Sequence, residues 1–337
     1  MEIGEWNLNW QNIKRAVQHP SRVVDEILLY FLIRSPLTFI NAIRPFGTNI
    51  FDREWDVVII LDTCRVDALK QLQDEYDFIK IVDSVWSVGG NSPEWIARTF
   101  DSRHTDVLKN TAYLSANPHA QRILEDKIQY ENDNHFNFRL LRNFPSVDKE
   151  DLGKLEYIFK YEPMGESGQY GHRSGGTPPR YVTDRAIDVG RNEEYERLVL
   201  HYFQPHSPWV ANANADNSEL RPHEEGFGYI TETGDSDSAW EAYLDDLRWV
   251  LDDIEILINN IDADKIVITA DHGDAFGEYN VLSHKIGAIH PKIRKVPWMV
   301  TSGKDTNTHT TSIEEPDDTA VNKEQIDNQL SALGYKT

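Results

Sequence analysis

The sequence predicts an α/β fold with a large, mostly parallel central sheet flanked by helices. Three short apolar segments, at 55–61, 197–203 and 265–270, indicate strands. They are rich in β-branched residues, as expected for strands covered on both faces. Helical periodicity separates them, most clearly at 240–261, where apolar residues recur at spacings of three and four. Strands that alternate with helices are typical of a parallel sheet.

Weaker patterns predict the remaining elements. Residues 78–82 indicate another strand, and 106–115 indicate a further one that ends before Asn117. Ser92 followed by Pro93 predicts a helix from Ser92 to about Phe100, with Ser92 as its N-cap. Two polar segments are predicted to be loops because they lack periodicity or are rich in glycine and proline, namely 165–179 and 211–239.

Three regions are expected along the chain. They are an N-terminal helical extension at 1–50, the main α/β domain at 51–305, and an acidic tail at 306–337 with a short helix near 322–333. The start lacks the apolar core of a secretory signal, so the expected location is cytoplasmic. The uncharged runs within 20–45 are too short to span a bilayer. We expect this segment to dock on the domain, and contact with a membrane surface is the alternative.

The charge balance disfavours one class of partner. Asp and Glu total 56 against 34 Lys and Arg, which gives a formal net charge of −22. Such a field repels the phosphates of nucleic acids, so we expect no nucleic-acid partner. A diffuse acidic surface suits a halophilic protein, whose self-repulsion is screened by salt; an ordinary acidic cytosolic protein is the alternative. Cys64 is the only cysteine, which excludes an intrachain disulfide.

Polar side chains follow the three clearest strands: Asp62, His206 and the pair Asp271-His272. Ligands of open α/β sheets bind outside the carboxyl ends of the strands, so these groups are expected to converge. Carboxylates combined with an imidazole suit zinc or manganese better than calcium or magnesium. We therefore predict Asp62, Asp271 and His272 as ligands of a divalent metal. The alternatives are a helix cap for Asp62 and a plain polar turn for Asp271-His272.

Ser92 is the candidate nucleophile. A hydroxyl at a helix N-terminus lies near N–H donors, and a neighbouring metal would lower its pKa. Ser87 and Asn91 are rivals for the role, and Ser92 as a cap only is the plainest alternative.

Two further histidines and a lysine complete the predicted site. His206 lies on a proline-stiffened loop and is predicted as a donor to substrate or a general acid. His284 and Lys285 are predicted to contact the anion, with His284 as a metal ligand in the alternative. His290 is the rival of His284.

Four segments together resemble the sulfatase branch of the alkaline phosphatase superfamily, including its haloarchaeal members. They are 57–69, 205–209, 265–278 with Asp-His-Gly at 271–273, and 296–298. The resemblance covers roughly 55–302. It implies a large α/β fold, a divalent metal held by Asp62, Asp271, His272 and the nucleophile, and in-line attack on phosphorus or sulfur through a covalent enzyme ester.

The sequence departs from that pattern in two places. It lacks the Cys- or Ser-x-Pro-x-Arg motif that sulfatases oxidise to formylglycine, and Thr63 stands where calcium-binding sulfatases have a second aspartate. Both differences favour a serine or threonine nucleophile.

The leading hypothesis is a metal-dependent hydrolase of phosphate or sulfate esters, acting on a small molecule or a glycan. The alternatives are a transferase that moves a phospho- or sulfo-group onto a glycan or lipid, a non-catalytic protein that keeps the fold, and a membrane-surface scaffold.

Overall fold

The computed structural model describes residues 46–126, 146–161, 170–285 and 287–313. The extension predicted over 1–50 lies outside the described residues except for 46–50. The segment 20–45 and the helix predicted near 322–333 lie wholly outside them. In the described part of the chain, no helix combines the length and the apolar character needed to cross a membrane.

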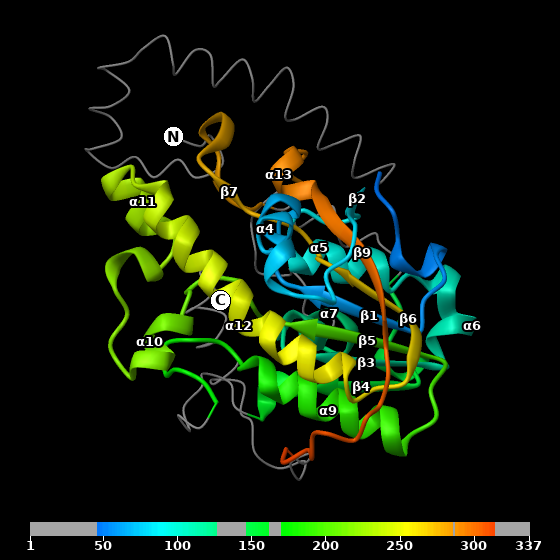
Figure 1. Ribbon diagram of the computed structural model, residues 1–337. Helices are drawn as coiled ribbons and strands as arrows, with labels where there is room; N and C mark the ends of the chain where they lie inside the picture. Colours follow the sequence, from blue (N-terminus) through cyan, green and yellow to red (C-terminus); the bar gives the residue numbers. More distant parts are fainter. Residues whose placement is uncertain (1–45, 127–145, 162–169, 286, 314–337) are drawn as a thin grey trace.

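A seven-stranded sheet forms the centre of the molecule, with the order β2-β9-β6-β1-β5-β3-β4 (Figure 1). Neighbouring strands are parallel except that β9 runs antiparallel to both β6 and β2. The predicted α/β fold with a mostly parallel sheet is therefore confirmed. The strands are β1 (Val57–Leu61), β2 (Val82–Trp86), β3 (Thr111–Ser115), β4 (Lys154–Tyr157), β5 (Arg197–Tyr202), β6 (Ala263–Thr269) and β9 (Lys295–Gly303).

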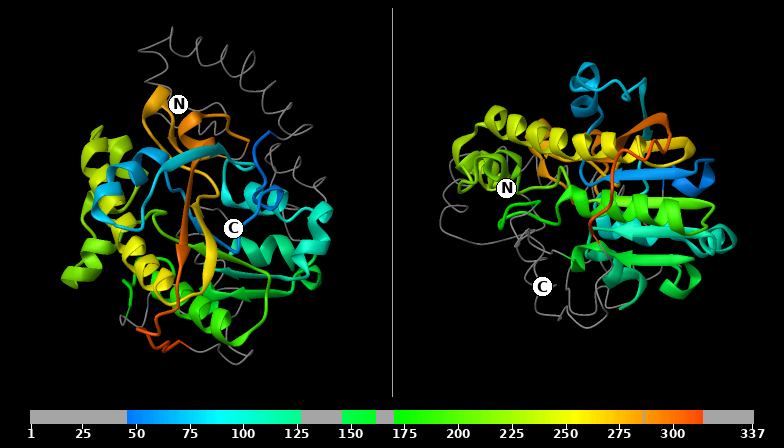
Figure 2. Two further views of the ribbon diagram at one scale, coloured as in Figure 1. Left: turned by 45° about the vertical axis from the view of Figure 1, so that its right-hand side comes forward. Right: turned by 60° about the horizontal axis from the view of Figure 1, so that its bottom comes forward.

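Helices cover both faces of this sheet (Figure 1, Figure 2). One face packs against α4 (Val66–Gln71), α9 (Pro179–Asn192) and α12 (Ser236–Ile258). The other packs against α5 (Ser92–Thr99), α6 (Thr105–Leu108) and α7 (His119–Leu124). The remaining pieces are α10 (Ala211–Asp216), α11 (Phe227–Thr233), α13 (Pro291–Arg294) and the hairpin of β7 (Ala275–Phe276) and β8 (Leu282–Ser283).

Strand β1 shows why the apolar segments form buried strands. Val57, Ile59 and Leu61 enter one apolar core, and Val58 and Ile60 enter the other. All five side chains are buried because successive residues of a strand point to opposite faces. A continuous apolar segment is therefore what a strand at the centre of this sheet requires.

Four predicted elements need correction. The strand expected at 78–82 is shifted, because pairing with β9 begins at Val82 and Ile81 is exposed. Residues 105–108 form helix α6 rather than strand. The predicted loop at 211–239 holds α10, α11 and the start of α12, since short polar helices show little apolar periodicity.

The fourth correction concerns the start of α5. The side chain of Asn91, not that of Ser92, accepts the hydrogen bond from the backbone N–H of Glu94. Asn91 is therefore the N-cap, and Ser92 is the first helical residue. Its hydroxyl is thus released from the capping role that the sequence suggested.

Candidate functional site

The carboxyl ends of the adjacent strands β1 and β6 bring Asp62 next to Asp271 and His272. Ile60 of β1 lies opposite Thr269 of β6 in the parallel register, so both chains leave the sheet at the same level. Asp62, Asp271 and His272 are fully buried, and each offers a ligand atom within 4.8 Å of the others. The convergence expected from the sequence is present in the structure.

Ser92 joins this group from the first turn of α5. Its Oγ lies 3.3 Å from Asp62 Oδ2 and 3.3 Å from His272 Nε2. His272 Nε2 in turn lies 3.3 Å from Asp271 Oδ2 and 3.6 Å from Asp62 Oδ1. Ligands held at about 2.0–2.2 Å by one tetrahedral ion stand about 3.3–3.6 Å apart. The four contacts given match that spacing, and the ligand atoms of Asp62, Asp271 and His272 all lie within 4.8 Å of one another.

The two carboxylates each keep one oxygen without a hydrogen-bond partner among the described residues. Asp62 Oδ2 accepts a hydrogen bond from Asn117 Nδ2 at 2.8 Å, and Asp271 Oδ1 accepts from the backbone N–H of His272 at 2.8 Å. Asp62 Oδ1 and Asp271 Oδ2 are buried and lack such a partner. Burial, reinforced by the Asp271 charge, raises the pKa of Asp62 well above its usual value. A cation between the two carboxylates would remove this penalty.

His272 is held in the form that can bind a metal. Its Nδ1 lies 3.1 Å from the carbonyl oxygen of Gly273, which can only accept, so Nδ1 carries the proton. The lone pair of Nε2 is then directed at Ser92 and the two carboxylates. Burial, followed by the proximity of His284, lowers the pKa of His272 well below its usual value and keeps the ring neutral.

The chemistry of these donors fits a divalent cation. Two carboxylates, a neutral imidazole and a hydroxyl are the ligand types that zinc or manganese accepts. The unpaired oxygens of Asp62 and Asp271 face the other donors rather than solvent. Asp62, Asp271, His272 and Ser92 are therefore able to hold such an ion.

The rivals of Ser92 are engaged elsewhere. Ser87 Oγ donates to the backbone carbonyl of Asp271, and Asn91 caps α5. Ser92 is buried, with its Oγ facing Asp62 and His272 at the positive end of the α5 dipole. Among the three candidates, only Ser92 presents its side chain to the carboxylates and the imidazole.

Two of the remaining predicted residues lie beside the cluster. The ring centroids of His284 and His272 are 4.2 Å apart, and those of His206 and His284 are 5.5 Å apart. Lys285 is exposed, and its carbonyl oxygen would lie 2.8 Å from a Cβ added at Gly90, so its segment passes close to the start of α5. His290 accepts a hydrogen bond from the backbone N–H of Lys292 and caps α13, which gives this rival a structural role.

His206 and His284 differ in charge. His206 Nδ1 donates to the carbonyl oxygen of Ser207, and burial lowers the pKa of His206 to about 4. Burial alone would also lower the pKa of His284, but the Asp274 carboxylate, 2.7 Å from its Nδ1, outweighs burial and raises it. Near neutral pH His206 is therefore neutral, whereas the Asp274 carboxylate shifts His284 toward the charged form.

Sequence reasoning missed four participants. Asn117 orients Asp62, Asp274 pairs with His284, and His201 lies 3.8 Å from Asp271. Thr63 has φ 67°, a left-handed conformation that is strained for a β-branched residue. Asn117 follows β3 as Asp62 follows β1, so its position at a strand end was a usable signal. The contacts of Asp274 and His201 and the backbone angle of Thr63 depend on tertiary structure and leave no local signal in the sequence.

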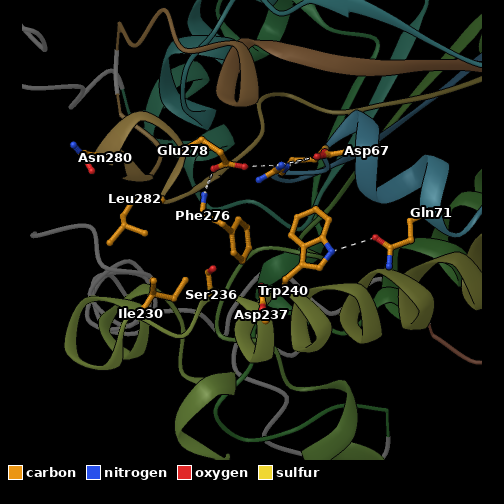
Figure 3. A pocket seen from close by; sticks show the side chains of 13 residues that line it. Asp67, Gln71, Ile230, Ser236, Asp237, Trp240, Phe276, Glu278, Asn280 and Leu282 are labelled. Carbon is orange, nitrogen blue, oxygen red and sulfur yellow. Dashed lines mark hydrogen bonds and ion pairs between the residues drawn. The ribbon is translucent and has the colours of Figure 1, made fainter.

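A pocket of about 810 Å³ lies between α12 and the segments that follow Asp62 and His272. Trp240 stands in it between Gln71 and Phe276 (Figure 3). Arg65 binds Asp67 and Glu278 there and also donates to the carbonyl of Asp274. It thus ties the loop after Asp62 to the loop after His272. None of the seven predicted site residues lines this pocket. Its lining consists of Arg65, Asp67, Gln71, Ile230, Gly234, Ser236, Asp237, Trp240, Phe276, Gly277, Glu278, Asn280 and Leu282.

Comparison with known proteins gives structural neighbours only. No family model and no curated protein matches the sequence. The soluble domain of lipooligosaccharide phosphoethanolamine transferase A from Neisseria meningitidis is similar at 15% identity and TM-score 0.47, over 75% of this chain and 77% of that one. The integral membrane form of that transferase matches at 15% identity and TM-score 0.48, over 90% of this chain. The chain spans 60% of its length.

A sulfatase-type neighbour is also found. A putative sulfatase from Bacteroides thetaiotaomicron is similar at 12% identity and TM-score 0.38, over 84% of this chain and 71% of that one. These neighbours are described as a phosphoethanolamine transferase, in two forms, and a putative sulfatase. Identity and TM-score are low, so the chemistry of this chain has to be argued from its own residues.

Proposed function

We propose that the chain is a metal-dependent hydrolase of phosphate or sulfate esters that uses Ser92 as its nucleophile. The observation that carries the proposal is the placement of Ser92 Oγ, 3.3 Å from both Asp62 Oδ2 and His272 Nε2. Asp271 completes this set of donors. A plain helix cap would not need two buried carboxylates whose unpaired oxygens lie 3.6 Å (Asp62 Oδ1) and 3.3 Å (Asp271 Oδ2) from His272 Nε2.

Asp62, Asp271 and His272 hold the cation in this proposal. When bound, a zinc or manganese ion lowers the pKa of the Ser92 hydroxyl and offsets negative charge on the group being transferred. The residues themselves fix the direction of attack. Ser92 lies on a capped helix, and Asn117 and the N–H of His272 fix the carboxylates.

Ester cleavage then divides into two steps. In the first, Ser92 Oγ bonds to phosphorus or sulfur, its proton passes to Asp62 Oδ2, which already accepts its hydrogen bond at 3.3 Å, and the bond to the leaving alcohol breaks. His284 donates a proton from Nε2 to the departing oxygen, since its Nδ1 is held by Asp274 and its pKa is raised. In the second step, water gives a proton back to His284 and displaces Ser92, whose Oγ recovers its proton from Asp62.

His206 was predicted as a donor to substrate or a general acid, and both roles remain predictions. Its pKa of about 4 makes it a poor acid near pH 7. We therefore assign proton donation to His284. The neutral His206, whose Nδ1 donates to Ser207, keeps a lone pair on Nε2 and is assigned a contact with the nearby cation. Lys285, on the segment that follows His284, is proposed as a second positive contact for the anionic group.

A transferase uses the same first step. The covalent Ser92 ester would then be attacked by a hydroxyl of a glycan or lipid instead of by water. The Ser92 site is common to both activities, and the fate of the ester distinguishes them. A non-catalytic protein would bind the metal without forming the ester.

The test is turnover of aryl phosphate, phosphodiester and aryl sulfate esters in high salt, with added manganese or zinc. High salt is used because the net charge of −22 suggests a halophilic protein. Asp271→Ala and Ser92→Ala are expected to lose activity at least about 10³-fold, and Ser102→Ala, on the surface, serves as the control. The ester that is cleaved fastest shows whether the protein acts on phosphate monoesters, phosphodiesters or sulfate esters.

The covalent step is followed separately by mass spectrometry. A Ser92 ester that water clears rapidly supports the hydrolase. An ester that persists until an alcohol acceptor is added establishes the transferase instead. Metal binding without ester formation on any of the three substrates would contradict both.

A further inference from the structure

His201 is a buried histidine that the steps above do not use. It belongs to β5, where it lies opposite Ile60 of β1 and Ser115 of β3. Its neighbours along the strand are apolar or aromatic, and the side chain has no exposed surface. A polar ring in the centre of a sheet requires compensating partners.

One side of the ring has such a partner. Tyr113, on β3, has its hydroxyl 2.8 Å from His201 Nδ1. The edge of Trp95 packs against the ring at a centroid distance of 5.5 Å, and Tyr113 stacks on it at 6.2 Å. The orientation of His201 is therefore fixed by one hydrogen bond and two aromatic contacts.

The other side of the ring faces Asp271. His201 Nε2 lies 3.8 Å from Asp271 Oδ2, and neither atom has a hydrogen-bond partner among the described residues. The separation exceeds a hydrogen bond, but it is short enough for an N–H dipole to stabilise a buried carboxylate. A small rotation of Asp271 would convert it into a hydrogen bond.

The tautomer follows from these two neighbours. A lone pair on Nε2 would point at the negative Oδ2, whereas a proton there is attracted to it. Nδ1 is then the acceptor, and the hydroxyl of Tyr113 donates to it. Tyr113, His201 and Asp271 thus form a chain that leads from the core to an oxygen facing His272 Nε2 at 3.3 Å.

We propose that His201, oriented by Tyr113, is a positioning residue that holds Asp271 Oδ2 in place for the divalent cation. The proposal rests on the function proposed above. Groups behind a metal ligand set the ligand's orientation and typically change metal affinity or activity by about 10–100-fold. His201 acts through Asp271 and touches neither ester nor cation.

Tyr113→Phe is the sharpest variant because the chain contains a matched control. Tyr202 is also a fully buried tyrosine, and its hydroxyl lies 2.9 Å from Thr183 Oγ1, in the core beneath α9. Tyr113→Phe and Tyr202→Phe each remove one buried hydroxyl that contacts a neighbouring side chain. Only the first hydroxyl is linked to Asp271.

The measurement is the dissociation constant for zinc, obtained by competition with a chromophoric chelator, together with the visible spectrum of the cobalt-substituted protein. We expect Tyr113→Phe to weaken zinc binding about 10-fold or more and to shift the cobalt spectrum. Tyr202→Phe should leave both unchanged. His201→Gln, which keeps an N–H donor, should bind zinc more tightly than His201→Leu.

The outcomes separate this inference from the proposed function. Wild-type protein that binds neither zinc nor manganese would overturn both. Wild-type protein that binds zinc, with Tyr113→Phe and Tyr202→Phe both matching it, would overturn the role of His201 alone. A loss of affinity shared equally by the two tyrosine variants would show a general packing effect and would also overturn it.

Discussion

Two buried acidic sites lie at the first turns of α5, Glu94 on the helix and the pair Asp62 and Asp271 beside it, and they differ in how their negative charge is compensated. Glu94 accepts hydrogen bonds from the backbone N–H groups of Gly90 at 2.8 Å and Gly287 at 2.9 Å. It also pairs with Arg98 at 2.8 Å and with Arg294 at 3.4 Å. Burial alone would raise the pKa of Glu94, but the two arginines outweigh burial and lower it.

Asp62 and Asp271 have no arginine or lysine within ion-pair distance among the described residues. Their partners are amide and backbone donors, Ser92 and a neutral imidazole, and burial raises the pKa of Asp62 instead of lowering it. Glu94, Arg98 and Arg294 therefore form a complete cluster, in which the protein itself balances the carboxylate charge. Asp62 and Asp271 form an incomplete cluster, which needs an external positive charge. Compensation, rather than the number of acidic residues, distinguishes a structural cluster from a metal site.

Glu94→Gln tests the complete cluster and should have the largest effect on stability. The amide oxygen can still accept from both backbone N–H groups, which donate to the same Glu94 oxygen, but the charge between two buried guanidinium groups is removed. We expect a loss of about 3–5 kcal/mol in the free energy of unfolding, measured by urea denaturation. The control is Asp262→Asn, which removes an exposed ion pair with Lys304 and should change stability little. A small loss for Glu94→Gln would contradict the comparison.

Asp62→Asn tests the incomplete cluster and should have the opposite sign in metal-free protein. Removing one of two adjacent buried charges is expected to stabilise the chelator-treated protein by about 1–3 kcal/mol. Asn keeps an oxygen that can accept from Asn117. Added zinc should reverse the order, since it stabilises only a protein that binds it. Urea denaturation with chelator and with zinc measures both states, and a metal-free variant less stable than wild type would refute the interpretation.

The incomplete cluster was also the more predictable of the two. A buried strand that ends abruptly in Asp62, or in Asp271-His272, is a local pattern, and parallel strands bring such ends to one edge. Glu94 lies on a helix whose arginine partner Arg294 is 200 residues away. Nothing local in the sequence indicates that pairing.

Other parts of the fold show the same limit. The strands at β1, β5 and β6 were predicted because they are continuous apolar segments. The helices within 211–239 were not, because their polar surface faces carry little periodic signal. The sequence does not distinguish His201 from any other histidine on a strand. Its role becomes visible only when the fold places Tyr113 at Nδ1 and Asp271 near Nε2.

Asp246 offers an intermediate case, a buried carboxylate with backbone donors and, in the described part of the chain, no cationic partner. Its Oδ1 accepts from the N–H groups of Val210 at 2.8 Å and Ala211 at 3.0 Å, yet burial raises its pKa to about 8. The folded state thus favours the protonated form. The stability that protonation contributes is complete below about pH 4 and is lost as pH rises to about 8.

Asp246→Asn should therefore gain stability relative to wild type across that interval. The neutral amide retains the oxygen that serves both N–H groups, so the two proteins should be similar near pH 4. By pH 8 the variant should be more stable by at least about 1 kcal/mol. Urea denaturation at pH 4, 6 and 8 follows the difference, with Glu241→Gln, on the exposed side of α12, as the control. A difference that does not change with pH would show that backbone donors alone compensate this charge.

The smallest effect is expected at Thr63, where the incomplete cluster also carries backbone strain. Its φ of 67° is costly for a β-branched residue, and no residue from Gly89 to Glu94 has a positive φ. Thr63→Gly relieves that strain but loses the packing of a buried side chain and makes the unfolded chain more flexible.

These opposing terms should leave Thr63→Gly within about 1 kcal/mol of wild type in metal-free protein. Asn217→Gly, at φ 50° on the surface, is the control, because Asn already tolerates this conformation. If the strained turn fixes the N–H that Thr63 donates to Asp271 Oδ1 at 3.3 Å, the glycine variant should bind zinc more weakly despite its unchanged stability. Equal stability together with equal zinc affinity would show that the left-handed turn only connects β1 to α4 and does not hold Asp271.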